Sequence, residues 1–381
     1  MREHRIVPVA RRPDDIALGP DHPTLDGLPS IALAMAEDRV SGDGVVPAGR
    51  VVTAAEWLPG TVHRGAEKLF ESRDYRQILM LVDRHDWLSA FCSEIGVVVG
   101  VERALGLTPP PRAQHVRVLL AELTRIAHHL AFLAPLPGTL PAQWRATCWR
   151  WRGEALDLIE GATGHRVHPM FCQVGGVRAD VSEGWLGAVE TALGSWSVER
   201  IETPELAAVL RDAYAGVAPL ARAAALAYGA SGPVARASAV DLDLRRDDPT
   251  LPYPPFPVPI RTEGDAAARI ELLVAELTVS LELVGWAVER LRASQGEPVS
   301  VRLPKVLRVP EGTSYTWSEN PTGINGYLLV SRNERMPWRL KLRSAGFGNA
   351  AALSAALPGT RVSDLPAALA SFLLVCGDVD R

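Results

Sequence analysis

The sequence predicts a mainly helical α+β protein with a small β-sheet near its N-terminus. Apolar residues recur at steps of three and four over 116–133 and 270–291, as on the buried face of an amphipathic helix. Near the N-terminus, the short apolar runs 30–36 and 49–54 flank the turn signal SGDG, a pattern typical of paired strands. These two kinds of periodicity place strands first and long helices after them.

From His63 onward the apolar spacing is helical, and the first 62 residues form a separate β-rich segment in this interpretation. Within 63–381 we expect a helical core whose C-terminal portion contains strands, YLLV and WRLKLR among them. Glu122 and Arg125 stand three apart and can pair on one helix surface. Further helices are expected at 66–80, 84–106, 112–134, 143–162, 182–196 and 214–228.

The stretch 247–262 carries six prolines. Proline lacks the backbone N–H that helices and central strands require. We therefore expect an extended loop that crosses a surface.

Composition excludes several classes of protein. Of 381 residues 47% are apolar, enough for a sizeable core, and the net charge of -4 argues against a nucleic-acid footprint. The N-terminus has no apolar signal core, and no apolar run approaches the roughly 18 residues of a membrane span. If the protein works at a membrane, we expect partner subunits to bring it there.

The cysteines and histidines give no standard metal motif. Cys92, Cys148, Cys172 and Cys376 form no CxxC pair, which argues against zinc ribbons and ordinary iron–sulfur loops. The pairs 128–129 and 165/168 offer two histidines each, too few for a zinc site, and are interpreted as structural. Phosphate-loop, GxGxxG, HExxH and GxSxG motifs are missing, so we do not expect this chain to bind NADH itself.

Eight sequence blocks carry a resemblance to a known family. They are GPDHP (19–23), HRGAEKLFESRDY (63–75), RVLLAELTRIAHHLAFLA (117–134), GATGHRVHPMFCQVGGVRAD (161–180), SGPVARAS (231–238), EGDAAAR (263–269), PWRLKLRSAGF (337–347) and GDVDR (377–381). Each block is weak alone, but together and in this order they resemble the D-type subunit of bacterial NADH:quinone oxidoreductase, respiratory complex I. The large subunits of [NiFe] hydrogenases are relatives of that protein.

The hydrogenase branch of this resemblance requires two CxxC pairs, because nickel and iron take soft thiolate ligands. Those positions fall at Asp86, Ser89, Val375 and Asp378, and none is cysteine. The complex I branch therefore remains. It implies a hydrogenase large-subunit-like fold that binds no cofactor by itself.

The resemblance also implies a working context. The chain would form part of the quinone-reduction site with a [4Fe-4S]-bearing small subunit, while NADH and the other iron–sulfur clusters sit on partner subunits. Electron transfer from NADH to quinone would be coupled to ion translocation by membrane-arm subunits. The chain would lie peripherally at the cytoplasmic face of the cell inner or plasma membrane.

Quinone reduction needs hydrogen-bond donors at the carbonyl oxygens and groups that release protons near neutral pH. The family's headgroup histidine falls at Asp26 and its tyrosine at Trp87. Asp26 could serve if burial kept it protonated, or it could be a local turn former in LDG. Trp87 can donate an indole N–H but cannot release that proton, and its alternative role is a packed aromatic.

The resemblance implies three further candidates. His22 in GPDHP matches the family, with a structural histidine as the alternative. Arg84 matches an arginine near the terminal cluster, with a salt bridge to Asp83, Asp86 or Glu102 as the alternative. His168 lies beside Pro169, where the family has its cluster-proximal histidine, and Gly138 replaces a family acid.

Other matched residues are interpreted as supports of the fold. Glu67 and Lys68 belong to the HRGxEK block with His63 and Arg64. Arg236 and Asp265 are expected to anchor loops through charged hydrogen bonds. Asp380 and Arg381 end the chain as a candidate buried pair.

Two functional hypotheses follow. The first is a working quinone-site subunit of complex I, which could also be a divergent second copy. The second is a structural or assembly paralogue that kept the fold and lost quinone chemistry, a hypothesis motivated by Asp26, Trp87, Pro169 and Gly138. A metal-bearing hydrogenase would need the missing thiolate pairs.

Overall fold

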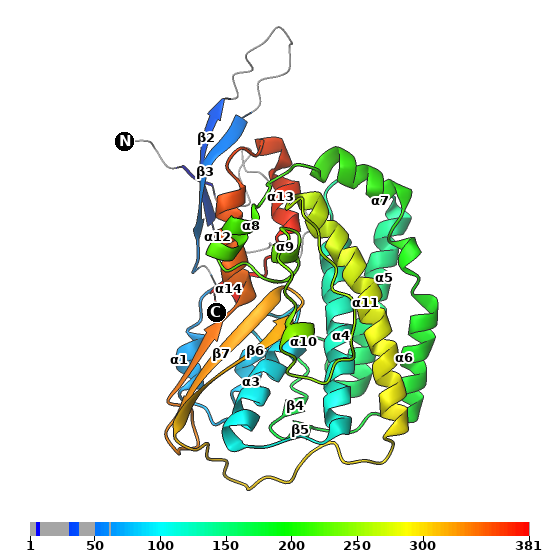
Figure 1. The fold of residues 1–381 in the computed structure, drawn as a ribbon, viewed down its shortest axis with the longest axis vertical. Helices are drawn as coiled ribbons and strands as arrows, with labels where there is room; N and C mark the ends of the chain where they lie inside the picture. Colours follow the sequence, from blue (N-terminus) through cyan, green and yellow to red (C-terminus); the bar gives the residue numbers. More distant parts are fainter. Residues whose placement is uncertain (1–4, 8–29, 38–49, 61, 381) are drawn as a thin grey trace.

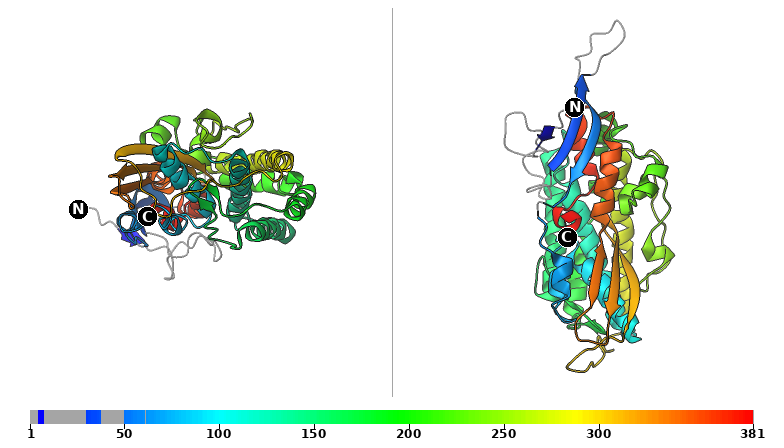
Figure 2. Two further views of the ribbon diagram at one scale, coloured as in Figure 1. Left: turned by 90° about the horizontal axis from the view of Figure 1, so that it is seen from below. Right: turned by 90° about the vertical axis from the view of Figure 1, so that its left-hand side faces the viewer.

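The computed structural model describes residues 5–7, 30–37, 50–60 and 62–380 and confirms the mixed, mainly helical architecture. The body is elongated, with a layer of long helices on one side and strands on the other (Figure 1). Figure 2 shows the same layers from below and from the strand side.

Five long helices build the helical layer, and four of them agree with a predicted stretch to within a few residues. The helix expected at 84–106 begins only at Ala90, because residues 84–89 form turns and not a helix. Apolar side chains on the inner faces of these helices form one continuous core. The five are α3 (Ala90–Leu105), α4 (Pro111–Leu133), α5 (Ala142–Thr163), α6 (Glu183–Ser195) and α11 (Ala266–Ala293), with α4 in the centre between α5 and α11. The central helix, α4, packs against both α5 and α11, because its apolar stripe is wide enough to face two neighbours.

Local chemistry sets the ends of these helices. Asp265 caps α11 by accepting the backbone N–H of Ala268 at 2.9 Å, and its other oxygen accepts that of Gly216 at 2.7 Å. Proline occupies the first position of α4, where no N–H partner is needed. Asp265 therefore caps the helix and, through its bond to Gly216, also anchors a loop as expected.

The expected helix at 66–80 is wrong: two short helices, α1 (Ala66–Phe70) and α2 (Leu79–Val82), occupy this stretch. Between them the carboxylate of Asp74 accepts the backbone N–H groups of Arg76 at 3.0 Å and Gln77 at 2.9 Å. A short polar side chain that binds nearby backbone in this way competes with the helical ladder.

The expected helix at 214–228 is also too long, since only α8 (Arg222–Ala227) forms there. Gly216 and Ala218 have φ of 72° and 46°, left-handed values that a helix cannot contain, and Pro219 follows. The preceding helical segment instead ends in a π-helical turn, Leu210–Tyr214.

The N-terminal sheet is antiparallel in the order β1 (Arg5–Val7), β2 (Ser30–Glu37) and β3 (Arg50–Leu58). The apolar runs 30–36 and 49–54 predicted the two longer strands of this sheet, β2 and β3. The turn SGDG lies outside the described residues.

A second antiparallel sheet packs on α3 and contains the predicted YLLV and WRLKLR strands. Its strands are β6 (Gly312–Asn320), β7 (Gly323–Ser331) and β8 (Arg339–Arg343). Gly96 and Gly100 permit this close approach, because a Cβ at either would overlap Tyr327 or Thr316. The proline-rich stretch predicted at 247–262 has neither helix nor strand after Asp247, which is still helical.

The C-terminal helices return to the N-terminal sheet, and the first of them packs against β3 (Figure 1). They are α12 (Ala345–Ala356), α13 (Leu365–Ser371) and α14 (Cys376–Asp380). Val52 of β3 donates to the carbonyl of Thr360 at 2.9 Å and accepts from Gly359 at 2.8 Å.

Short elements connect these layers: β4 (Cys172–Gln173), β5 (Gly176–Val177), a 3-10 turn (Val198–Arg200), α7 (Pro204–Val209), α9 (Gly232–Arg236), α10 (Leu244–Asp247) and a second 3-10 turn (Val362–Asp364). None of the described helices combines the length and the apolar character needed to cross a bilayer.

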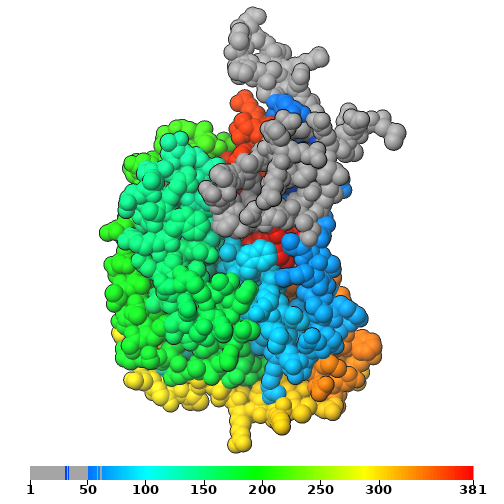
Figure 3. All heavy atoms as spheres, turned by 180° about the vertical axis from the view of Figure 1, so that it is seen from behind, coloured from blue at the N-terminus to red at the C-terminus, as the bar shows by residue number. Residues whose placement is uncertain are grey.

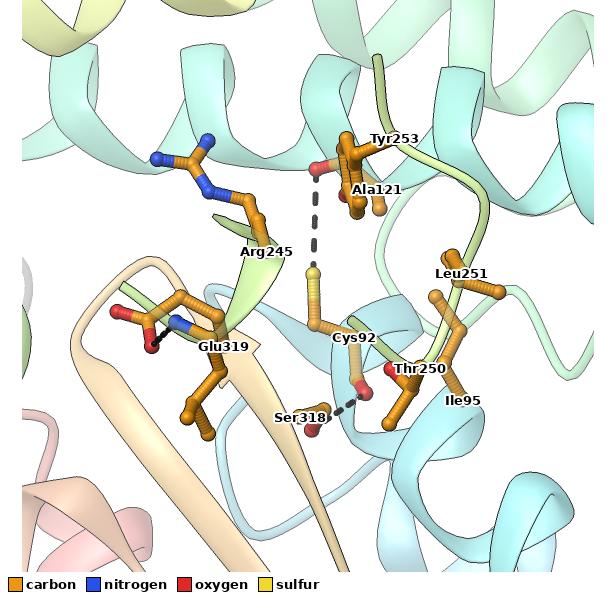
Figure 4. A pocket seen from close by; sticks show the side chains of 10 residues that line it. Cys92, Ile95, Ala121, Arg245, Thr250, Leu251, Tyr253, Ser318 and Glu319 are labelled. Atoms are coloured by element: carbon orange, nitrogen blue, oxygen red, sulfur yellow. Dashed lines mark hydrogen bonds between the residues drawn. The ribbon is translucent and has the colours of Figure 1, made fainter. Parts of the chain in front are cut away.

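The core contains a buried ion network where a surface pair was expected. Arg125 lies 3.3 Å from Glu122, but both side chains are fully buried. Arg245 binds Glu122 at 3.1 Å, and Arg236 binds Glu276 at 2.7 Å, so both of these buried carboxylates have a guanidinium partner. Figure 4 shows a small pocket at the edge of this network, lined by Cys92, Ala121, Arg245, Tyr253 and Glu319 among others.

Candidate functional site

Three segments far apart in the sequence meet at the candidate site: the link between α2 and α3, the loop before β4, and α14. His168 approaches the backbone carbonyl of Asp83 at 3.1 Å. His85 approaches the carboxylate of Asp378 at 3.1 Å, although 293 positions separate them. Seen from behind, the blue-to-cyan segment after β3 and the red C-terminal segment meet on this face of the molecule (Figure 3).

Trp87 stands at the junction of these segments. Its ring and the carbonyl of His85 both pack on the backbone of Gly377, where no side chain could be accommodated. The indole also lines a small pocket together with Pro169 and Arg152. The structure thus brings together Trp87 and Pro169, two of the altered positions singled out in the sequence.

Arg84 points from the same link toward the protein surface. Its Nη1 donates to Asp83 at 2.7 Å, the pairing expected as its structural alternative, and lies 3.9 Å from the sulfur of Met170. Of the other proposed partners, Glu102 binds a different arginine and Asp86 binds Ser89. The side chain of Arg84 remains 40% exposed, so a fixed positive charge is available at this face.

His168 lies beside Arg84 and is partly exposed. A carbonyl only accepts hydrogen bonds, so Nδ1 carries the proton that is donated to Asp83, and Nε2 is left as an acceptor or second donor. Burial, and then the charge of Arg84, lower the pKa of His168 below its ordinary value. The imidazole is therefore neutral at neutral pH.

A buried polar cluster lies behind Trp87, where the hydrogenase relatives would have thiolates. Ser89 donates to Asp86, and Asp378 accepts from His85 and, at 2.6 Å, from the backbone of Gly346. Burial, and then the charge of Asp378, raise the pKa of Asp86 to about 6. The cluster can form hydrogen bonds and exchange protons.

The sequence interpretation missed His85 as a functional candidate. A signal was present, since DRHD places four ionisable residues in a row between the apolar runs ILMLV and WLSAF. Their burial could be guessed from that setting, but the partner Asp378 could not.

The donor atoms of the described residues do not suit a soft metal. Burial raises the pKa of the thiols of Cys92, Cys148 and Cys376 to about 12, and that of Cys172 well above the ordinary value. All four are therefore thiols and not thiolates at neutral pH. Within the described chain, no three His, Cys, Asp or Glu residues are grouped so that they could hold a metal ion.

Glu94, also missed in the sequence, anchors the loop that carries His168 and Pro169. Its carboxylate accepts the backbone N–H groups of Met170 at 2.7 Å and of Phe171 and Cys172 at 2.9 Å each. The sequence signal was a lone charge inside the apolar stretch 90–101. Glu94 therefore connects α3 to this side of the site.

The C-terminal residues fasten the start of the helical region. Asp380 accepts the backbone N–H groups of Gly60 at 2.8 Å and Val62 at 2.9 Å, and its carbonyl oxygen lies 2.7 Å from Nδ1 of His63. The predicted partner Arg381 lies outside the described residues.

Other matched residues have contacts within the fold. Glu67 binds Arg339 at 2.6 Å, and Lys68 binds Glu71 at 2.5 Å. Arg236 donates to the carbonyl of Leu242 at 3.1 Å in addition to its place in the buried ion network. The candidates His22 and Asp26 lie outside the described residues, so their roles stay predictions.

Comparison with known proteins adds to this geometry. The model of the family "Respiratory-chain NADH dehydrogenase, 49 Kd subunit" matches residues 144–307 and 299–381. The second D-type subunit of NADH-quinone oxidoreductase in Salinispora tropica is 46% identical, over 96% of this chain and 92% of its own length. The D-type subunit of Clostridium beijerinckii is 32% identical, over 95% of this chain and 96% of its own.

A solved structure is similar in fold along nearly the whole chain. It is a chain of the membrane-bound sulfane sulfur reductase, an archaeal respiratory membrane complex, with 28% identity and a TM-score of 0.82. The match covers 93% of this chain and 94% of that one.

Proposed function

The chain belongs to the family of the 49 kDa subunit of respiratory-chain NADH dehydrogenase, and from that premise we propose that its Trp87 face forms part of a quinone-reduction site. The chain is a subunit of an NADH-quinone oxidoreductase and works inside a multi-subunit respiratory complex. The observation that carries the proposal is the convergence of Arg84, Trp87 and Pro169, three positions of the family's site, on one face.

The residues of this face fit the needs of a quinone headgroup. Trp87 offers an indole N–H that can be donated to a carbonyl oxygen and a ring that can pack against the quinone. Asp26 remains our proposed second headgroup partner and His22 a candidate beside it. Quinone accepts two electrons and two protons, so groups that release protons must lie nearby.

The second part of the proposal concerns the electron donor. Arg84 and His168 lie together at the surface, and a fixed positive charge stabilises a reduced iron–sulfur cluster across an interface. We infer that the small subunit bearing the [4Fe-4S] cluster binds to this face. NADH is oxidised on other subunits, and ion translocation belongs to the membrane arm.

We place the chain peripherally at the cytoplasmic face of the membrane, held by these partners. This proposal agrees with the lack of a spanning helix among the described helices and with the membrane-bound complex that contains the structural relative.

A structural paralogue without quinone chemistry is the second candidate. One observation favours it: Trp87 and Pro169, which line the same pocket, cannot release a proton there. In that case the pocket and its partners are retained while the reaction is lost.

Purification of the tagged chain in mild detergent, with identification of co-purifying subunits, separates these candidates. NADH:quinone reduction is measured beside NADH:ferricyanide reduction, which takes electrons before the quinone site. Partners with both activities support the proposed function. Partners with ferricyanide reduction alone support the paralogue and contradict the quinone site.

A further inference from the structure

The inference rests on the proposed function and concerns the wall that α5 gives to the small pocket lined by Trp87 and Pro169. Arg152, near the middle of α5, lines this pocket as well. Leu156 and Ile159 follow it one and two turns further along the helix and also line the pocket. One face of α5 is therefore turned toward the pocket, and this face carries an arginine.

The rest of the pocket wall gives Arg152 no counterion. Apart from the indole of Trp87, its other side chains are apolar with two exceptions, Thr124 and Arg166. The hydroxyl of Thr124 donates to a backbone carbonyl of its own helix at 2.7 Å, and Arg166 pairs with Asp157 of α5. Among the described residues no carboxylate lines this pocket.

The guanidinium of Arg152 is unpaired within the described part of the chain. Its Nε is buried and has no hydrogen-bond partner there, and the group forms no ion pair with the described carboxylates. Its Cζ lies 5.7 Å from the centre of the Trp149 ring, near the outer limit of a cation–π contact. Burial, and then the charge of Arg166, lower the pKa of Arg152, but an arginine remains protonated at neutral pH.

An uncompensated positive charge in a half-buried place lowers the stability of the folded chain, because burial removes part of its hydration. The arginines of the buried ion network differ in this respect, since Arg236 and Arg245 each bind carboxylates. Folded proteins accept such local costs mainly at functional sites. The N–H groups of Arg152 are thus available to a ligand that enters the pocket.

The form of the pocket indicates which part of a ligand it receives. The pocket is small and mostly apolar, so it accepts the oxygen end of a headgroup and not a whole ring. Val167, which lines the pocket, is 47% exposed, so the pocket is accessible from this side. A carbonyl oxygen that gains negative charge on reduction is the kind of acceptor to which a guanidinium binds most strongly.

We propose that Arg152 binds the quinone oxygen that enters the Trp87 pocket and stabilises the negative charge that develops on it during reduction. The partner's iron–sulfur cluster is oxidised in two one-electron steps, and the quinone is reduced to quinol. Two protons come from water, and two O–H bonds form on the quinone oxygens. Arg152 gives up no proton, since its N–H groups only donate hydrogen bonds.

The test uses the purified complex with Arg152→Gln, which keeps hydrogen-bond donors but carries no charge. We expect kcat/KM for quinone reduction to fall roughly 10- to 100-fold, the effect of losing a hydrogen bond to a charged group. Most of the loss should appear in kcat, because the contact strengthens as charge develops on the oxygen. Arg152→Lys keeps the charge and should recover part of the rate, with NADH:ferricyanide reduction unchanged in both variants.

The matched control is Arg150→Gln, which changes an exposed arginine of the same helix and should behave as wild type. Urea unfolding of the chain separates a binding role from a structural one. Loss of an uncompensated charge should leave the unfolding midpoint of Arg152→Gln at the wild-type value or above it. Loss of a structural contact would lower that midpoint.

Wild-type kinetics in Arg152→Gln overturn the inference and leave the proposed quinone site intact. A lowered rate together with a lowered unfolding midpoint, neither of them recovered by Arg152→Lys, overturns it as well. A wild-type complex that reduces ferricyanide but not quinone overturns the proposed function itself, and this inference with it.

Discussion

The carboxylate of Glu94 accepts the backbone N–H of Met170 at 2.7 Å, and this bond connects the interior of α3 to the loop that carries His168. Met170 has a φ of 44°, a conformation that a methionine adopts only when its surroundings hold it there. The bond therefore gives the loop its shape.

Glu94→Gln places an amide NH₂ group against backbone donors that need an acceptor. We expect a loss of about 1–3 kcal/mol in the free energy of unfolding, the cost of an unsatisfied buried group. Quinone reduction should fall with it, since His168 and Pro169 would move. Urea unfolding and turnover are compared with those of Glu289→Gln, an exposed position on α11. Equal stability of the two variants would contradict the anchoring role.

Asp86→Asn tests the charge of the buried cluster. Because the pKa of Asp86 is raised to about 6, the folded protein binds a proton that the unfolded chain releases near 4, so stability falls as pH rises across this window. Ionisation of the buried Asp86 above pH 6 lowers the free energy of unfolding by at most about 3 kcal/mol. The asparagine variant has no such carboxylate, so we expect its stability relative to wild type to improve from pH 5 to pH 8.

The control is Asp212→Asn, an exposed residue whose carboxylate is 68% accessible. A pH-independent stability difference for Asp86→Asn would show that Asp86 is ionised throughout the range and would refute the raised pKa.

Arg84→Ala tests the electron-donor face. Loss of the positive charge should lower the reduction potential of the partner's adjacent cluster by on the order of tens of millivolts. Arg84→Lys keeps the charge and should retain most of the potential. An EPR-monitored redox titration of the purified complex measures both, and equal potentials in wild type and Arg84→Ala would remove Arg84 from the cluster's neighbourhood.

Periodicity predicted the long helices because their energetics are local and repetitive. α4 and α11 bury wide apolar faces, and their bounds match the apolar stripes. The stretch 66–80 differs because α1 ends at Phe70 and the side chain of Asp74 then binds the backbone of Arg76 and Gln77. Hydrogen bonds of this kind leave no periodic trace in the sequence.

The candidate site was predictable only in part. The family resemblance predicted Arg84 and Trp87 as site residues, while the contact of His85 with Asp378 depends on how the last helix folds back across 293 positions. No spacing rule encodes such a contact. Glu122 and Arg125 were expected to pair on a helix surface, but both are buried and belong to the ion network of the core.

Trp87→Tyr asks whether this site has changed its proton donor. A tyrosine restores a hydroxyl at the family's position, and if the face binds quinone, that hydroxyl can donate to the headgroup and release its proton. The smaller ring gives up part of the packing on Gly377, which we expect to cost about 1–2 kcal/mol of stability. Quinone reduction should nonetheless be retained or increased several-fold.

Trp87→Phe is the matched control, since it has the same ring as tyrosine without the hydroxyl. It should bind quinone more weakly than either wild type or Trp87→Tyr, because no donor remains at this position. The comparison is made at several quinone concentrations so that KM and kcat are separated. If tyrosine and phenylalanine give identical kinetics, the group at residue 87 makes no hydrogen bond to the quinone and does not contribute a proton to it.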